Sequence, residues 1–219
     1  MLFEDVREVH LNFVNGMVNV SAWDEDAVEV SYTKHGEVDL IVENMGGKLV
    51  INEKPRRKFR FLGIIKAEEG WVEIELKVPR GVPVNARNVN GELIADGIRF
   101  TDVTTVNGEI TLRNCEAELM KSVNGEIDAH LRVAGPLEVS TVNGDITVTI
   151  EELEGDVNVN CVNGDITLRL TEFCDARIEA KKVNGDVELV GIGQDGIIGT
   201  GEFPIRIKTV NGDVRVEIV

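Results

Sequence analysis

The sequence is poor in the residues that usually build chemical sites. Its 219 residues include 3 histidines and 3 cysteines, and 5% are aromatic. No G-x-S-x-G, H-E-x-x-H or P-loop motif occurs, and no cysteine and histidine have the spacing of a catalytic pair. His10, His35 and His130 are isolated in the sequence, which argues against a metal site. We therefore predict that the protein is not an enzyme and has no catalytic residue and no cofactor.

Long apolar runs are also missing. The most apolar stretch, residues 61–65, is too short to cross a bilayer. The first ten residues carry charges where a signal peptide needs an apolar run. Cys115, Cys161 and Cys174 have no C-x-x-C spacing and cannot all pair with one another, so three free thiols in a reducing compartment are the simplest account. These absences predict a cytoplasmic protein.

Positive charge is scarce relative to negative charge. Lys and Arg number 23 against 39 Asp and Glu, which gives a net charge of −16. Such an acidic chain repels phosphate backbones, so we do not expect a nucleic-acid partner. With 42% hydrophobic and 28% charged residues, the composition is that of a folded protein rather than a disordered acidic tail.

The sequence does contain a clear internal repeat. The tetrapeptide V-N-G-[D/E] occurs seven times, and a degenerate copy without the acidic residue lies at residues 13–17. The asparagines of the seven copies are Asn90, Asn107, Asn124, Asn143, Asn163, Asn184 and Asn211. Intervals of 17 to 27 residues between them indicate that one structural unit recurs along the chain.

The residues that flank each N-G pair alternate between apolar and polar. Counting from the asparagine as position 0, position +3 is always aliphatic, and positions −4 and −6 are usually apolar with polar residues between them. Period-two alternation bounded by glycine is typical of strands, and no segment has a convincing helical period. Each repeat is therefore predicted to be a strand, an N-G turn and a second strand, and the protein to be all-β.

Two arrangements of these strands remain open. An N-G pair between strands is the usual signal for a two-residue hairpin, which would give an antiparallel β-meander or sandwich. A β-solenoid, in which each repeat is one coil and like residues stack on like residues, explains better why every turn is the same. We favour a β-helix-like solenoid of about seven coils. Its structural turn residues would include Asn107, Gly108, Asn124, Gly125, Asn143, Gly144, Asn163 and Gly164.

Residues 1–80 alternate in the same way but lack the full repeat. The segment V-P-R-G-V-P at residues 78–83 has two prolines with a glycine between them, which breaks a central strand. We therefore divide the chain into an N-terminal β-rich capping module, residues 1–80, and a repeat β-solenoid, residues 81–219.

At this junction the sequence resembles a known family. The stretch V-E-I-E-L-K-V-P-R-G-V-P-V at residues 72–84, followed by V-N-G-D-I-T units, is similar to the "putative adhesin" family of bacterial and archaeal β-strand-repeat proteins. The resemblance spans nearly the whole chain. It implies a β-helix-like solenoid without an established activity, and it offers no catalytic residues to transfer.

The acidic residues at position +2 form one candidate site. In a solenoid, seven carboxylates would stack about 5 Å apart and repel one another. They belong to Glu92, Glu109, Glu126, Asp145, Asp165, Asp186 and Asp213. A Ca²⁺ ladder would relieve the repulsion, but Ca²⁺-binding β-rolls use G-G-x-G-x-D units with more ligands in each turn. We favour the alternative, in which each carboxylate accepts hydrogen bonds from its own turn and no metal is bound.

The second candidate is a basic segment at residues 54–66, which holds six of the 23 basic residues. Basic side chains interleaved with aromatic ones suit a protein partner or an acidic membrane surface, and less readily a single-stranded nucleic acid. The residues concerned are Arg56, Arg57, Lys58, Phe59, Arg60 and Phe61. The alternative is the tip of a long hairpin, with residues 49–52 and 71–78 as its strands, folded onto the protein's own acidic body.

The sequence thus favours a non-catalytic structural or interaction solenoid that serves as a scaffold or self-associates. An adhesin-like module that binds carbohydrate or another surface is the alternative. Because residues 209–219 form a full repeat with no cap after it, the last strand would expose unpaired backbone. We therefore expect a homo-oligomer that forms through this C-terminal solenoid end, as a two-fold, end-to-end dimer.

Overall fold

The fold is built from strands alone. In this computed structural model, which describes residues 1–54 and 70–219, every regular element is a β-strand. Among these residues there is no helix that could cross a membrane. The all-β prediction is confirmed.

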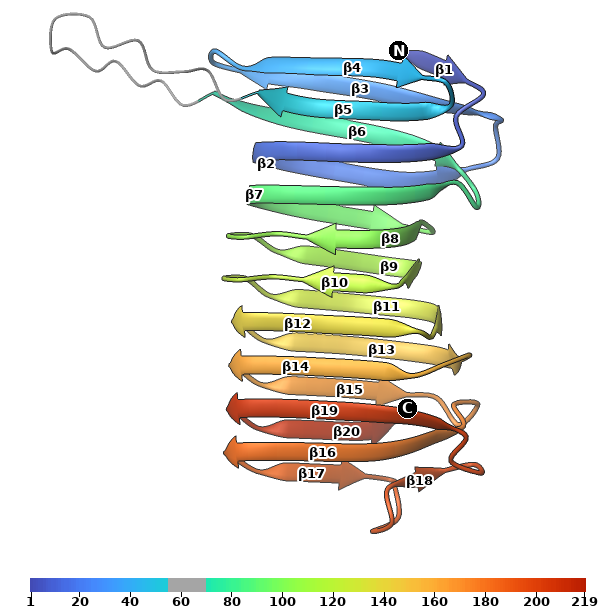
Figure 1. The fold of residues 1–219 in the computed structure, drawn as a ribbon, viewed down its shortest axis with the longest axis vertical. Coiled ribbons are helices and arrows are strands. Elements are labelled where there is room, and N and C mark those ends of the chain that lie inside the picture. The colour runs from blue at the N-terminus through green and yellow to red at the C-terminus, as the bar shows by residue number, and fades with distance from the viewer. Residues whose placement is uncertain (55–69) are drawn as a thin grey trace, which may run out of the picture.

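Each repeat forms one coil of a β-solenoid (Figure 1). The first strand of a coil lies in one sheet, the V-N-G turn carries the chain around an edge, and the second strand lies in the facing sheet. Strands of neighbouring coils pair in parallel with equivalent residues opposite each other, as Ile127 does with Ile146 and Ile146 with Ile166. The solenoid prediction is confirmed. The antiparallel meander is wrong, because the N-G pair is a corner between two sheets rather than a hairpin turn.

We call the sheet that precedes the turns the first face and the sheet that follows them the second face. The strands β2 (Glu8–Trp23) and β7 (Pro83–Asp96) run around the edge and contribute to both faces. The first face otherwise contains β4 (Asp39–Met45), β5 (Lys48–Lys54), β8 (Arg99–Thr104), β10 (Leu119–Lys121), β12 (Leu137–Asn143), β14 (Val157–Asn163), β19 (Phe203–Asn211), β16 (Ala176–Asn184) and β18 (Ile197–Ile198). The second face otherwise contains β1 (Leu2–Glu4), β3 (Ala27–His35), β6 (Trp71–Pro79), β9 (Ile110–Ala117), β11 (Ile127–Ala134), β13 (Ile146–Leu153), β15 (Ile166–Leu170), β20 (Val214–Ile218) and β17 (Val187–Val190).

The coils are not stacked in the order of the sequence. β19 pairs with β14 on one side and with β16 on the other, and β20 lies in the same way between β15 and β17. The last repeat is therefore inserted into the stack, and Figure 1 shows the C-terminus away from its end. The terminal coil is β16–β17. Our expectation that the C-terminal repeat is the open end of the solenoid is wrong, because both of its edges are paired.

The N-terminal region is interleaved as well. β2 lies between β7 and a coil made of β5 and β6, with β5 on the first face and β6 on the second. The hairpin predicted between residues 49–52 and 71–78 is therefore wrong, because these strands belong to opposite faces. The pairing of β2 with β7 from Val9 to Ser21 continues both faces across residue 80.

The two ends of the solenoid are closed to different degrees. At the N-terminal end, antiparallel strands cover both faces, since β4 pairs with β5, β3 with β6 and β1 with β3. At the other end only the two-residue β18 pairs with β16, opposite Ala176 and Arg177. In the described part of the chain, no strand lies beyond the outer edge of β17.

The hydrophobic core fills the space between the two faces. Side chains at position +3 point inward and stack on one another, and those of Ile110, Ile127, Ile146 and Ile166 are at most 1% exposed. Burying one branched aliphatic side chain contributes about 1.5–3 kcal/mol. The buried residues form one cluster that runs through the whole stack, so the coils stabilise one another through their neighbours.

Candidate functional site

The turn edge of the solenoid carries a continuous ladder of asparagine side chains. In each of the seven full repeats Nδ2 of the turn asparagine donates a hydrogen bond of 2.7–2.9 Å to Oδ1 of the asparagine in the neighbouring coil. The order along the ladder is Asn15, Asn90, Asn107, Asn124, Asn143, Asn163, Asn211 and Asn184. Because all the amides point the same way, the ladder holds every turn in one orientation.

The glycine after each asparagine is required by the spacing of the coils. A Cβ atom on Gly108 would lie 1.8 Å from the carbonyl oxygen of Gly91, and one on Gly125 would lie 1.9 Å from that of Gly108. Both distances are far below van der Waals contact, so any side chain here would push neighbouring coils apart. The structure therefore places the predicted turn residues at this edge, with close approach as the main reason for glycine.

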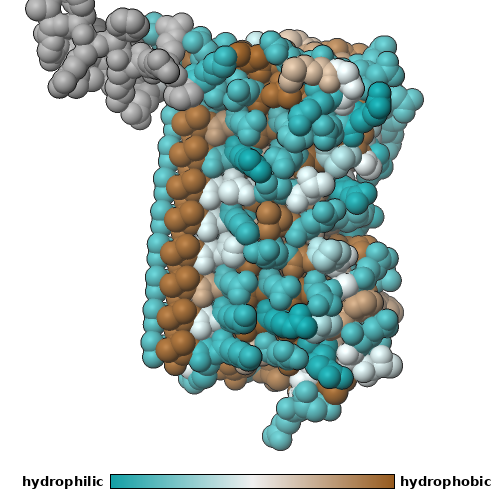
Figure 2. All heavy atoms as spheres, viewed as in Figure 1, coloured by the Kyte–Doolittle hydropathy of each residue, from teal (hydrophilic) through white to brown (hydrophobic). Residues whose placement is uncertain are grey.

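In the seven full repeats the valine before the asparagine is exposed. In six coils its side chain is 37–41% exposed, and Val183 in the terminal coil is 71% exposed. Figure 2 shows an unbroken apolar column beside a polar column along one edge of the molecule. We name the apolar column the valine ridge, and it consists of Val89, Val106, Val123, Val142, Val162, Val210 and Val183. Because the asparagine ladder joins the turns in register, the valines lie in one straight column.

On the first face, the surface next to the ridge is hollowed into a groove of about 350 Å³. The ridge forms one wall, small buried side chains at position −2 form the floor, and side chains at position −3 form the far wall. The floor consists of Ser122, Thr141, Cys161 and Thr209, and the far wall of Ser140, Asn160 and Lys208. The hydroxyls of Ser122 and Thr209 have no hydrogen-bond partner among the described residues.

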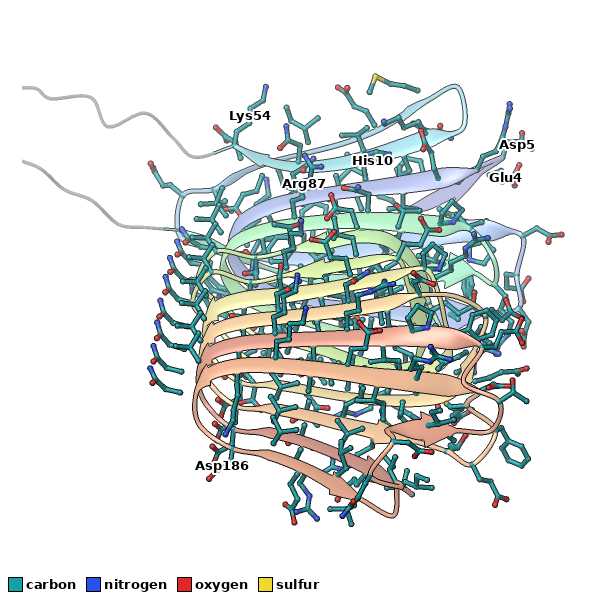
Figure 3. The ribbon with its side chains drawn as sticks, turned by 60° about the horizontal axis from the view of Figure 1, so that its bottom comes forward. Glu4, Asp5, His10, Lys54, Arg87 and Asp186 are labelled. Atoms are coloured by element: carbon teal, nitrogen blue, oxygen red, sulfur yellow. The ribbon has the colours of Figure 1, made fainter. Side chains whose placement is uncertain are left out.

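Position −3 is basic in four of the seven repeats. It is occupied by Arg87, Lys121, Lys208 and Lys181 in four coils and by no acidic residue in the others. Two of these residues pair with carboxylates on the same face, Arg87 with Asp102 and Lys121 with Glu138, both at 2.9 Å. Lys208 and Lys181 lie opposite each other on β19 and β16, and within residues 1–54 and 70–219 neither forms an ion pair. Figure 3 labels Arg87, at one end of this basic column.

The acidic residues at position +2 lie across the ladder, at the start of the second face. Oδ1 of Asp145 accepts a hydrogen bond of 2.8 Å from the backbone N–H of Asp165 in the neighbouring coil. The same contact joins Asp165 to Asp213 and Asp213 to Asp186, which Figure 3 labels in the terminal coil. The donor in these coils belongs to the neighbouring coil, whereas we expected it in the carboxylate's own turn. Across the described residues, no group of three potential metal ligands is arranged to hold an ion.

A buried carboxylate ends the turn edge at the N-terminal side. In the interior, the backbone N–H of a turn asparagine donates to a valine carbonyl of the neighbouring coil, as Asn107 does to Val89 at 2.7 Å. At the first described turn, Oε2 of Glu53 instead accepts hydrogen bonds from the backbone N–H groups of Val14, at 2.7 Å, and Asn15, at 3.1 Å. Glu53 is only 5% exposed, so its side chain takes the place of a neighbouring turn.

The terminal coil leaves its core side partly open. Val187 is 37% exposed, whereas the equivalent Val214 of the adjacent coil is 0% exposed. The backbone N–H of Val214 donates to the carbonyl of Asp186 in the terminal coil, at 2.8 Å. The equivalent N–H of Val187 has no coil beneath it in the described structure. This end therefore presents unpaired backbone and apolar side chains near the turn edge.

Two sets of residues singled out in the sequence lie elsewhere. The six candidate partner-binding residues of the basic segment fall within residues 55–69, outside the described residues, so their role stays a prediction. The three cysteines are buried and unbridged, and burial raises the pKa of each thiol, that of Cys161 to about 11. Among the histidines, Nε2 of His130 lies 2.9 Å from a carboxylate oxygen of Glu151.

Sequence reasoning missed the valine ridge, although its signal was present. Positions −6 and −4 are apolar and point inward, so strict alternation places position −1 on the outward side. An apolar residue at that outward position in every copy of the repeat marks an exposed surface rather than core. The basic column at position −3 could have been found by the same reading.

Comparison with known proteins identifies the family. The model of the Toastrack DUF4097 family matches residues 6–217. A search of curated proteins found no match. The crystal structure of a "putative cell adhesion protein" from Clostridium sporogenes ATCC 15579 is 15% identical, with a TM-score of 0.41, over 100% of this chain and 97% of that chain. The crystal structure of a "putative adhesin" from Bacteroides fragilis NCTC 9343 is 9% identical, with a TM-score of 0.42, over 100% of this chain and 96% of that chain. Since the family model covers the chain almost from end to end, in agreement with the resemblance in its sequence, the chain belongs to the Toastrack DUF4097 family.

Proposed function

We propose that this protein is a non-catalytic interaction module that binds another macromolecule through its turn edge. The observation that carries the proposal is the valine ridge, an unbroken column of exposed apolar side chains along the solenoid. Soluble proteins seldom leave a large contiguous apolar surface uncovered unless a partner binds there.

The construction of the edge supports this role. The asparagine ladder and the paired strands hold the ridge in one conformation, so little conformational entropy is lost when a partner docks. The ridge is also flanked by polar or basic side chains at position −3 and by acidic ones at position +2, which gives an apolar centre with a polar rim. Protein interfaces have the same arrangement.

The shifted titratable groups fit a module without catalysis. Hydrogen bonds from Arg215 and Arg169 lower the pKa of Glu217, and backbone N–H groups and Thr200 lower the pKa of Asp175. Both carboxylates thus have structural partners that explain their shifts, and neither faces the groove beside the ridge. Perturbed groups of this kind belong to structural networks rather than to an active site.

Photo-crosslinking in cells tests the proposal. The photoreactive residue p-benzoylphenylalanine is placed at position 142 on the ridge and, as the control, at position 147 in the same coil on the second face. We expect a discrete cross-linked adduct from position 142 and none from position 147.

Matched charge variants show whether the adduct depends on the ridge. Val106→Lys with Val162→Lys should abolish the adduct from position 142, because two charges interrupt the apolar column. Thr111→Lys with Thr167→Lys adds the same charge to the same two coils on the second face and should leave the adduct unchanged. An adduct that still forms in the Val106→Lys, Val162→Lys variant would refute the proposal. So would the lack of any adduct from position 142 in the chain without these two substitutions.

A further inference from the structure

We infer that the partner of the valine ridge is a second copy of this chain, docked with the ridge of each copy in the groove of the other. The two-fold axis of this dimer runs parallel to the solenoid axis. The inference rests on the proposed function, because it names the partner of the same edge.

The spacing of the ridge favours a second copy. Neighbouring coils pair in register, so the valines repeat at the strand spacing of about 4.8 Å. The hollows in the groove floor repeat with the same period over four coils, in which position −2 is a small side chain: Ser122, Thr141, Cys161 and Thr209. A partner that packs valine into hollow over several coils must have the same period. A second copy of this solenoid meets that condition along the four coils of the groove.

The charges beside the ridge favour the same partner and fix its orientation. Position −3, which is basic in four of the seven repeats and is called the basic column here, flanks the ridge on one side, and the acidic column at position +2 flanks it on the other. A two-fold axis parallel to the solenoid sets the basic column of each copy against the acidic column of the other. An axis perpendicular to the solenoid would set like columns against each other, which costs energy. Lys208 and Lys181, which have no ion-pair partner among the described residues, would then face Asp213 and Asp186 of the second copy.

The open terminal coil is the other surface on which a second copy could dock, but it is shorter. β18 already pairs with β16 at Ala176 and Arg177, and the N–H of Ile178 donates to the carbonyl of Gly196 at 2.8 Å. Only the part of the coil near the turn is free, whereas the ridge passes along seven coils. The opposite end is closed by antiparallel strands, so head-to-tail stacking has no matching surface.

Sedimentation velocity tests the dimer at high micromolar protein concentration. The unmodified chain should sediment as a dimer, and Val106→Lys, Val142→Lys and Val162→Lys together should convert it to a monomer. Thr111→Lys, Thr147→Lys and Thr167→Lys are the matched control and should leave it dimeric. Circular dichroism melting shows whether each variant is folded before it is compared.

A pair of charge-reversed variants tests the orientation. One variant carries Lys208→Glu and Lys181→Glu, and the other carries Asp213→Lys and Asp186→Lys. Each alone opposes like charges across the two-fold axis, so its dimer should dissociate with a constant at least roughly tenfold larger. Mixed together they restore opposite charges on both sides, and a heterodimer should form. Failure of the mixture to associate would overturn the proposed axis.

The outcomes separate this inference from the proposed function. An adduct of twice the chain mass from position 142 supports the second copy. A monomeric protein whose position 142 gives an adduct of another mass overturns the second copy but keeps the interaction module. A dimer that survives the ridge lysines and is lost in Glu188→Pro is an end-to-end dimer through β17, which also overturns the inference. A monomer without any adduct overturns both.

Discussion

Nδ2 of Asn211 donates a hydrogen bond of 2.8 Å to Oδ1 of Asn163, although 48 residues separate the two in the sequence. Asn184, which lies between them in the chain, is on the far side of Asn211 and donates to it at 2.7 Å. The last repeat thus sits between two coils that precede it. This insertion protects its strand edges and leaves β16–β17 as the terminal coil.

The ladder predicts that the same substitution costs more inside the stack than at its end. Asn124→Ala removes two ladder hydrogen bonds, to Asn107 and from Asn143, each of 2.8 Å. Asn184→Ala removes one. At a net value of about 0.5–1.5 kcal/mol for each bond, the interior variant should lose about twice as much free energy of unfolding. Urea unfolding measures both, and equal losses would contradict an energetic role for the ladder.

The glycine column predicts a large effect of side chains in the turn. A Cβ atom on Gly144 would lie 2.3 Å from the carbonyl oxygen of Gly125, and φ there is +141°. Gly144→Val should therefore lower the free energy of unfolding by about 3–5 kcal/mol, from overpacking and backbone strain together.

Gly193→Val is the control for that substitution. Its closest contact is Oδ1 of the Asp195 side chain, which can rotate away, so the loss should be much smaller. Thermal melts of the two variants make the comparison, and similar shifts in melting temperature would show that coil spacing does not require glycine.

The buried carboxylate of Glu53 predicts that its removal lowers stability far more than removal of an exposed glutamate. Glu53→Ala leaves the half-buried N–H groups of Val14 and Asn15 without their acceptor, so it should cost about 2–4 kcal/mol. Glu43→Ala removes an exposed glutamate from β4 and should change stability by no more than about 0.5 kcal/mol. Denaturant titrations report both values. An unchanged midpoint for Glu53→Ala would mean that the carboxylate does not terminate the edge.

The acidic column predicts the response to calcium. If backbone N–H groups of neighbouring coils satisfy these carboxylates, as they do for Asp145, Asp165 and Asp213, no cation is needed between them. Melting temperatures in millimolar Ca²⁺ and in EDTA should then agree. A rise of roughly 10 °C or more with Ca²⁺ would show tight binding to the folded state and would establish the calcium ladder instead.

The buried cysteines predict slow thiol chemistry. The thiolate is the reactive form, and burial raises the pKa of Cys115, Cys161 and Cys174. With a pKa of about 11, Cys161 stays protonated at pH 8. A chromogenic disulfide reagent at pH 8 should label none of the three quickly in the native protein and all three after unfolding in denaturant. Fast labelling of the native protein would indicate that the coils open locally.

The sequence by itself determined the strands, the turns and the coil. Alternation at positions −4, −6 and +3 identified the inward residues, because a strand with one buried face must alternate. Identical V-N-G turns selected a solenoid over a meander, because only stacked coils place equivalent residues on one another. The carboxylate column also followed from that stacking, although the donor to each carboxylate did not.

Only the tertiary structure decided the order of the coils and the ends of the stack. The strands of every coil have nearly the same alternation and the same pairing groups along their edges. The repeat therefore gives no local signal for which coil pairs with which. β19 and β20 lie between strands that precede them in the sequence because the chain folds back over residues 191–202, after β17. This long-range arrangement is not encoded in the alternation of apolar and polar residues. The same holds for Glu53, whose role depends on where β5 lies relative to a turn 38 residues before it in the sequence. The local sequence pattern determines the strands, the turn and the inward side chains of one coil. Packing between coils determines which surfaces stay exposed to a partner.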